Sequence, residues 1–211
     1  MINIAIAEDH NMVRQGVIDF INSFEDFDVV IEASDGNELI DKLTRATVLP
    51  DICILDISMP GLNGYETMKV IRKNWLSVKT LVFSAFYTAF SVTEMLGNGA
   101  CGFLKKNSSP RQLQQALASV YYNDYYLSES ITRDLFNKPK DAVNFKITER
   151  EMEFLRHCCS ELSYKEIGGL MNVSPRTVEA FRDSLFTKFN LKTRAGLVLF
   201  ALQNGIVCIE K

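Results

Sequence analysis

Residues 52–61 read Ile-Cys-Ile-Leu-Asp-Ile-Ser-Met-Pro-Gly: four apolar residues, then an aspartate, then a turn sequence. A short continuous apolar run of this kind is typical of a strand buried on both faces, as in the interior of a parallel sheet. The first half of the chain holds four further apolar, β-branched runs of similar length. We therefore predict five strands, at 3–7, 29–33, 52–55, 80–83 and 102–104.

The segments between these runs have apolar residues at helical spacing. They predict helices at 13–24, 36–46, 64–74, 90–98 and 110–123. Five strand–helix units in series predict an α/β domain, with a parallel five-stranded sheet and helices on both faces. In such sheets, ligands bind where the strand order reverses, outside the carboxyl ends of the strands.

From residue 145 onward the pattern is entirely helical. Thr148 with Glu151, and Ser163 with Glu166, match capping boxes, and Ser174-Pro175 matches an N-cap followed by proline at the first helical position. We predict four helices at about 148–159, 163–171, 174–189 and 193–204, the middle two separated by a three-residue turn. The chain is thus expected to hold a domain at 1–127, a linker at 128–144 and an all-α helix-turn-helix domain at 145–211.

Composition limits the class of protein. The 211 residues are 47% hydrophobic and carry a net charge of −3. Residues 1–127 hold 10 Lys and Arg against 15 Asp and Glu (−5), whereas residues 144–211 hold 10 against 8 (+2). No apolar run approaches the roughly 18–20 residues of a membrane span, and the N-terminus lacks a signal-peptide pattern. We expect a cytoplasmic protein without membrane contact, with its five cysteines reduced.

Three carboxylates fall at the carboxyl ends of predicted strands: Glu8 and Asp9 after the first, and Asp56 after the third. Because the first and third strands can lie side by side, these groups are expected to converge. Clustered carboxylates repel one another unless a cation joins them, and an all-oxygen site suits Mg²⁺. Ser84 and Lys106 end the next two strands.

Taken together, Glu8-Asp9-His10, the segment 55–61, Ser84 and the strand leading to Lys106 resemble the receiver domain of two-component response regulators, a flavodoxin-like (βα)5 fold. The separations 84 − 56 = 28 and 106 − 84 = 22 agree with the family's spacing and select Lys106 rather than Lys105.

The resemblance implies that Asp56 accepts a phosphoryl group from a sensor histidine kinase or a phosphotransfer protein. It also implies Mg²⁺ held by Asp9, Asp56 and the carbonyl of Ser58, with Glu8 acting through water. Lys106 would supply a second positive charge and the Ser84 hydroxyl a hydrogen bond to the phosphoryl group. Phe103 would be the aromatic side chain that rotates inward when Ser84 moves. Beyond Mg²⁺-dependent self-phosphorylation and autodephosphorylation at Asp56, no enzyme activity is expected.

Residues 148–207 resemble the LuxR-type helix-turn-helix of the NarL/FixJ class. The third helix presents a predicted buried stripe, Val178, Phe181, Leu185 and Phe189, and a second face for the major groove of double-stranded DNA. The resemblance implies a dimer formed through the last helix. Candidate contacts to bases or phosphates are Arg176, Thr177 and Arg182, and candidate contacts to phosphates are Lys165, Lys188, Lys192 and Arg194.

Two acidic residues on the same helix, Glu179 and Asp183, repel phosphates, so we expect weak binding by one copy and dependence on a homodimer. Two alternatives stay open. A metal-dependent phosphatase could use an aspartate nucleophile, although the second aspartate of that pattern is Ser58 here. Alternatively, the helical domain could dock a protein partner.

Overall fold

The computed structural model describes residues 1–85, 87–136 and 147–207, with the side chains of 133–136 left out. The chain divides into two compact units, Met1–Asn137 and Lys138–Ile209. Much of the predicted linker, residues 137–144, and Cys208 lie outside the described residues. The predicted limits at 127 and 145 stay predictions.

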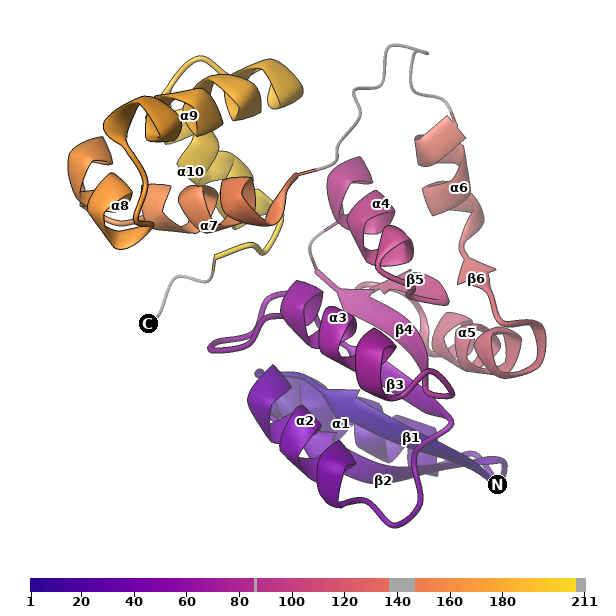
Figure 1. Ribbon diagram of the computed structural model, residues 1–211. Coiled ribbons are helices and arrows are strands. Elements are labelled where there is room, and N and C mark those ends of the chain that lie inside the picture. Colours follow the sequence, from indigo (N-terminus) through magenta and orange to yellow (C-terminus); the bar gives the residue numbers. More distant parts are fainter. Residues whose placement is uncertain (86, 137–146, 208–211) are drawn as a thin grey trace. The chain divides into compact units, whose positions relative to one another are not determined.

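The first unit is an α/β domain built on a parallel sheet, as predicted (Figure 1). The strand order is β2-β1-β3-β4-β5-β6. Its elements in chain order are β1 (Ile2–Ala7), α1 (Asn11–Asn22), β2 (Phe27–Ala33), α2 (Gly36–Arg45), β3 (Ile52–Leu55), α3 (Gly64–Asn74), β4 (Lys79–Ser84), α4 (Ala89–Gly97), β5 (Gly102–Lys105), α5 (Pro110–Asn123), β6 (Tyr126–Leu127) and α6 (Glu129–Phe136).

The predicted number of five strands is wrong by one. Tyr126 and Leu127 form a sixth strand that pairs in parallel with Gly102 and Phe103 of β5. The amide of Tyr126 donates to the carbonyl of Cys101 at 3.0 Å. Two residues are too few to show a periodic pattern, so this strand depends on the neighbouring edge and leaves no signal in the sequence.

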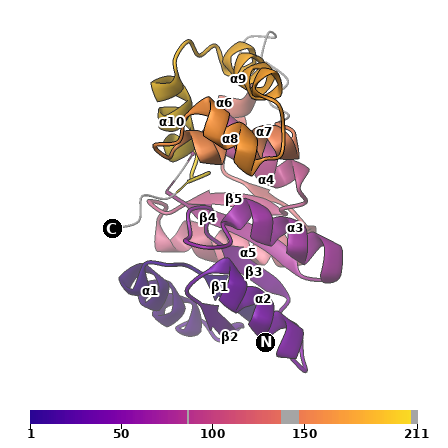
Figure 2. The same cartoon turned by 60° about the vertical axis from the view of Figure 1, so that its left-hand side comes forward.

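Helices cover both faces of the sheet (Figures 1 and 2). On one face, α1 and α5 pack against alternate residues of the strands, including Ile4, Ile6 and Ile54. On the other face lie α2, α3 and α4, which contact one another in that order. Every residue of β3 is buried, whereas β2, at the edge, has only its two end residues buried. The continuous apolar run at 52–55 is thus explained by burial on both faces.

A tight loop joins β3 to α3 behind Asp56. Asn63 caps α3, its side chain accepting a hydrogen bond from the amide of Glu66 at 3.1 Å. The amide of Gly64 donates to the carbonyl of Ile57 at 2.9 Å. A Cβ atom at Gly64 would lie 2.2 Å from the carbonyl oxygen of Asp56. Only glycine therefore lets α3 begin so close to the end of β3.

The second unit consists of α7 (Glu149–Cys158), α8 (Tyr164–Leu170), α9 (Pro175–Phe189) and α10 (Arg194–Gln203). Both predicted capping boxes are confirmed, as are the N-cap at Ser174 and the proline in the first turn of α9. A Cβ at Gly168 would lie 3.1 Å from the carbonyl oxygen of Val173 and 3.2 Å from the Val178 side chain. The close approach of α8 to α9 thus explains this glycine.

The predicted stripe on α9 is buried to different degrees. Val178 and Leu185 are fully buried, whereas Phe181 and Phe189 are half-buried. The Phe181 ring lies 6.1 Å from that of Phe154, and the Phe189 ring stacks on Phe200 at 4.1 Å between centroids. The two edge aromatics hold α9 against α7 and α10 respectively. In the described part of the chain, no helix has both the length and the apolar character needed to cross a bilayer.

Replacing Gly64 by alanine should destabilise the first unit by about 1–3 kcal/mol, because the new methyl group must displace backbone that carries Asp56. Urea unfolding monitored by circular dichroism measures the change. The control is Gly16→Ala in α1, where a Cβ meets nothing within 4 Å. That variant should gain up to about 1 kcal/mol from helix propensity. Equal stability of Gly64→Ala and the parent chain would contradict the packing described here.

Candidate functional site

The carboxyl ends of β1 and β3 lie side by side, with Ala7 paired to Leu55. The amide of Asp56 donates to the carbonyl of Ala7 at 3.0 Å, and that of Glu8 donates to the carbonyl of Ala33 at 3.1 Å. These bonds fix the backbone of both acidic residues at the point where the strand order reverses. Glu8 and Asp56 are almost fully buried there, at 1% and 2% exposure.

Lys106 joins these two carboxylates. Its Nζ lies 2.6 Å from Glu8 Oε2 and 2.8 Å from Asp56 Oδ2. The backbone supports this position, because the amide of Lys106 donates to the carbonyl of Ser84 at 3.0 Å, just beyond β5. The neighbouring Lys105 has its Nζ 3.5 Å from the centre of the Tyr87 ring instead. The structure thus brings together three of the residues singled out from the sequence.

Burial dominates the electrostatics of this pair of acids. Loss of solvent raises the pKa of Asp56 above its ordinary value, and the charge and hydrogen bond of Lys106 only partly offset this. Burial, followed by the negative charge of Asp56, also raises the pKa of Glu8. For Lys106, burial alone would lower the pKa, but the attraction of Asp56 and the bonds to both carboxylates outweigh it and the pKa is raised. The site therefore favours added positive charge.

The donor set fits a divalent cation. Ligand atoms of Glu8, Asp9 and His10 lie within 4.8 Å of one another, with His10 Nδ1 2.8 Å from Asp9 Oδ1. Glu8 and Asp56 face the single ammonium of Lys106, and Asp9 adds a third carboxylate beside Glu8. Carboxylate oxygens thus exceed the positive charge, as a hard cation such as Mg²⁺ requires. Ser58 is half-buried two residues after Asp56, and its role as a carbonyl ligand stays a prediction.

Ser84 and Phe103 lie on the inside of the domain. Ser84 is fully buried at the end of β4 and hydrogen-bonds to the Asp56 side chain. Phe103 is also fully buried, and its ring centre lies 6.2 Å from that of Tyr87. The structure thus shows both side chains in the inward position, while the movement between two positions stays a prediction.

In the second unit, Lys188 is engaged within the domain. Its Nζ lies 2.6 and 2.8 Å from the two carboxylate oxygens of Glu151, a residue that is 4% exposed. Ser184 donates to the same carboxylate. Although burial opposes ionisation of Glu151, the hydrogen bonds from Lys188, Ser184 and Thr148 outweigh it and lower its pKa to about 2. The ammonium predicted to meet a phosphate instead ties α9 to the start of α7.

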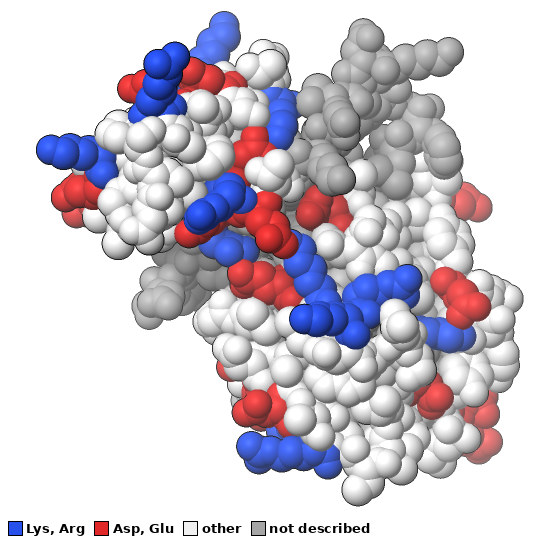
Figure 3. Space-filling view, in the orientation of Figure 1, with Lys and Arg blue, Asp and Glu red and all other residues white. Residues whose placement is uncertain are grey.

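Three other candidates are exposed. Lys165 on α8, Arg176 on α9 and Lys192 before α10 have no ion pair within the described ranges. Thr177 is half-buried, and its hydroxyl hydrogen-bonds to that of Ser174 at 2.9 Å. On the face shown in Figure 3, basic side chains of this unit alternate with acidic ones and form no continuous basic surface.

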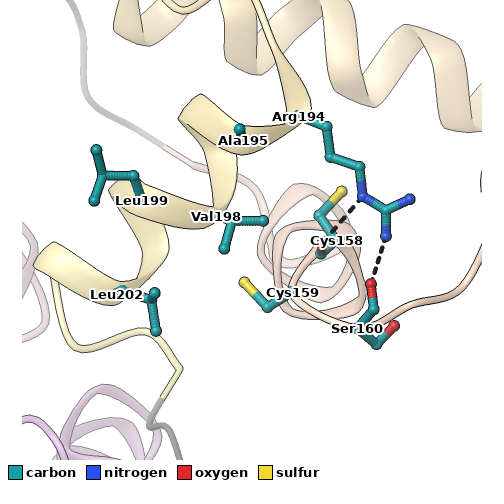
Figure 4. A pocket seen from close by; sticks show the side chains of 8 residues that line it. All are labelled: Cys158, Cys159, Ser160, Arg194, Ala195, Val198, Leu199 and Leu202. Atoms are coloured by element: carbon teal, nitrogen blue, oxygen red, sulfur yellow. Dashed lines mark hydrogen bonds between the residues drawn. The ribbon is translucent and has the colours of Figure 1, made fainter.

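Two further candidate DNA contacts, Arg182 and Arg194, contact their own domain. Arg182 pairs with Asp183 at 2.8 Å and lies over the Tyr164 ring. Arg194 donates to the carbonyls of Cys158 and Ser160, at 3.1 and 2.7 Å (Figure 4). These bonds occupy the end of α7 and orient the first turn of α10. Neither bond could be predicted, because each acceptor is a backbone carbonyl more than 30 residues away.

Beside Arg194, an apolar groove of about 460 Å³ separates α7 from α10. Figure 4 shows Val198 and Leu202 pointing toward Cys159, whereas Leu199 points away. Leu199 is 55% exposed. The last helix thus has apolar surface beyond what its own domain buries.

Comparison with known proteins identifies the families of the two units. Residues 4–118 match the family model of the response regulator receiver domain, and residues 146–201 match that of the luxR family of bacterial regulatory proteins. The chain is a response regulator of the NarL/FixJ class. The family consists of transcription regulators rather than enzymes in the ordinary sense.

Relatives share this organisation along their whole length. The oxygen regulatory protein NreC of Staphylococcus epidermidis is 35% identical, over 97% of this response regulator and 98% of the relative. The nitrate/nitrite response regulator protein NarP of Escherichia coli is 29% identical, over 96% and 95% of the two chains. A solved structure of RcsB from Salmonella enterica serovar Typhimurium, bound to promoter rprA with the phosphomimetic BeF3⁻, is 25% identical with a TM-score of 0.72, over 94% and 97% of the two chains.

Lys188→Met in this response regulator should destabilise the second unit by about 2–3 kcal/mol at neutral pH, because Glu151 then stays buried without its cation. The ionised Glu151 contributes stability in full above its ordinary pKa of 4.5, and this contribution is lost as the pH falls toward about 2. The difference in unfolding free energy between the parent and the variant should therefore shrink between pH 4.5 and 2. Urea titrations at several pH values measure it.

The control is Lys192→Met, which removes the same charge from an exposed position. It should change stability by less than about 0.5 kcal/mol at every pH. If the two variants were equally stable, the Glu151–Lys188 pair would have no structural role.

Proposed function

We propose that Asp56 accepts a phosphoryl group from a sensor histidine kinase or a phosphotransfer protein, and that this controls binding of promoter DNA by α9 in a homodimer. The observation that carries the proposal is the geometry at the sheet edge: a buried carboxylate flanked by a second acid, a lysine within 2.8 Å and a serine hydroxyl. Matches to both family models, and the DNA-bound RcsB structure with a phosphomimetic, support it.

In the proposed reaction, an oxygen of Asp56 forms a bond to phosphorus as the bond from phosphorus to the donor imidazole nitrogen breaks. The electron pair leaves with the imidazole, which takes a proton. Glu8, Asp9 and Asp56, with the Ser58 carbonyl, would hold Mg²⁺, which neutralises charge on the transferring group when bound. Hydrolysis of the acyl phosphate would return the site to its starting state, as self-catalysed turnover without a separate phosphatase.

Lys106 and Ser84 would stabilise the product. The phosphoryl group adds negative charge next to Asp56. The Lys106 ammonium already lies beside this carboxylate, where it donates a hydrogen bond to Oδ2. The Ser84 hydroxyl, which is hydrogen-bonded to Asp56 in the structure, would donate to a phosphoryl oxygen. Because Ser84 ends β4 and Phe103 lies in the paired strand β5, a shift at Ser84 changes the packing around Phe103. The predicted rotation of Phe103 is the conformational output of the receiver.

For DNA, the proposed contacts are the exposed side chains of Lys165, Arg176 and Lys192, on α8, α9 and the following turn, together with the half-buried Thr177. Lys188 and Arg194 are predicted from the sequence as phosphate contacts, and their bonds within the domain position α9 and α10. Arg182 forms an ion pair with Asp183, which offsets its charge. Two copies would pair through the exposed apolar surface of α10 around Leu199. Because each copy has few unpaired basic side chains, stable binding would require two copies, one on each half-site of the DNA.

Asp56→Asn should abolish incorporation of phosphate from radiolabelled acetyl phosphate, because an amide cannot attack phosphorus as a carboxylate does. Asp41→Asn, an exposed aspartate on α2, serves as the control and should label at the parent rate. Labelling of Asp56→Asn at the parent rate would show that the phosphoacceptor lies elsewhere.

Arg176→Ala should weaken binding of promoter fragments by roughly tenfold or more, the effect of losing one good arginine contact to a base or phosphate. Fluorescence anisotropy at several salt concentrations, with the protein phosphorylated, gives both the affinity and its salt dependence. Arg111→Ala in the first unit, equally exposed, should bind like the parent. An unchanged affinity for Arg176→Ala would exclude α9 as the reading element in the proposed orientation.

A further inference from the structure

A cavity of about 300 Å³ lies at the start of β4, at the other end of the sheet from Asp56. Its walls come from the end of α3, the start of β4, the turn before β5 and the residue that ends α5. Lys79 is the first residue of β4, whereas Ser84, beside Asp56, is the last. The cavity is therefore separate from the phosphoacceptor site, and its size is at the lower end of small-molecule pockets.

One wall carries a cation without a counter-charge. Arg72 is exposed on the last turn of α3, and no ion pair of its guanidinium occurs within residues 1–85, 87–136 and 147–207. Its side-chain stem crosses Gly99, which has φ of +101°, and a Cβ there would lie 2.9 Å from Arg72 Cδ. The absence of a Cβ at Gly99 thus leaves room for the Arg72 side chain beside the cavity.

The second cation of the cavity is already satisfied. Lys79 Nζ lies 2.7 Å from Asp124 Oδ1, donates to the carbonyl of Tyr121 and lies over that ring at 5.4 Å from its centre. Asp124 is held in the left-handed conformation, with φ of 60°, at the end of α5. Since Lys79 and Asp124 cancel each other, Arg72 leaves the cavity with one net positive charge.

The rest of the wall mixes apolar side chains with polar groups such as Ser77. Trp75 is half-buried, Leu76 is 68% exposed at the rim and Val78 is buried. Basic residues in the last turn of a helix often serve only the helix dipole, and Lys73 does so without lining the cavity. Arg72 differs from Lys73 because it is combined with an enclosed apolar surface.

We propose that this cavity binds a small monoanionic carboxylate with a compact or flat apolar body. The carboxylate pairs with the planar guanidinium of Arg72, whose two parallel N–H groups match its two oxygens. The body lies against Trp75 and Leu76. A single unpaired charge suits a carboxylate better than a phosphate dianion, which would leave one negative charge uncompensated.

The chain offers a direct probe of this site, because Trp75 is its only tryptophan. The full-length protein is titrated with benzoate while tryptophan fluorescence is recorded, and parallel titrations use benzamide, its neutral isostere, and inorganic phosphate. We expect a saturable change with benzoate in about the millimolar range, as for a ligand of this size, and at least tenfold weaker responses with benzamide and phosphate.

Arg72→Gln should weaken benzoate binding at least tenfold, whereas Lys73→Gln, one residue along the same exposed turn, should leave it unchanged. Thermal melts of both variants without ligand show that the fold is kept, and benzoate should raise the melting temperature of the parent and of Lys73→Gln but not of Arg72→Gln. The proposal is overturned by a non-saturable response to benzoate, by equal binding of benzamide or phosphate, or by an unchanged affinity in Arg72→Gln.

Discussion

The first unit depends on one interaction, the ammonium of Lys106 between the carboxylates of Glu8 and Asp56. The strand order places these two acids together at the end of a sheet that excludes water. Two buried negative charges at this spacing oppose each other's ionisation, and the cation partly offsets that cost. Burial still raises the pKa of Asp56, and the charge of Lys106 opposes this rise. The same charge that stabilises the pair is positioned to stabilise a phosphoryl group.

This arrangement also couples the site to the strands beyond it. Lys106 is tied to Ser84 through its backbone, and β5, which leads to Lys106, also carries Phe103. In the proposed reaction, new charge at Asp56 would act on Lys106 and Ser84 together. The pairing of β4 with β5 would then transmit a shift at Ser84 to the strand that carries Phe103.

Apolar patterns predicted most of this fold, because buried strands and capped helices depend on local sequence. The run at 52–55 and the capping box at Thr148 needed no knowledge of distant residues. The sequence failed where a partner lies far along the chain. The strand at Tyr126–Leu127 exists only because β5 offers an edge. The carboxylate that holds Lys188 lies 37 residues earlier in the sequence, within a capping box that already accounts for it.

The same limit explains why charge is a poor guide to the DNA-binding surface. Of the basic residues proposed as contacts, Lys188, Arg182 and Arg194 make ion pairs or hydrogen bonds within their own domain. The 10 Lys and Arg of residues 144–211 thus overstate how many cations are free to meet phosphates. Glu179, exposed on α9, adds a negative charge that repels phosphates. Because each released counterion contributes to affinity, we expect a single copy with so few free cations to hold DNA only weakly. Under the proposed function, control of pairing between copies would then be sufficient to control binding, without any change in the reading helix itself.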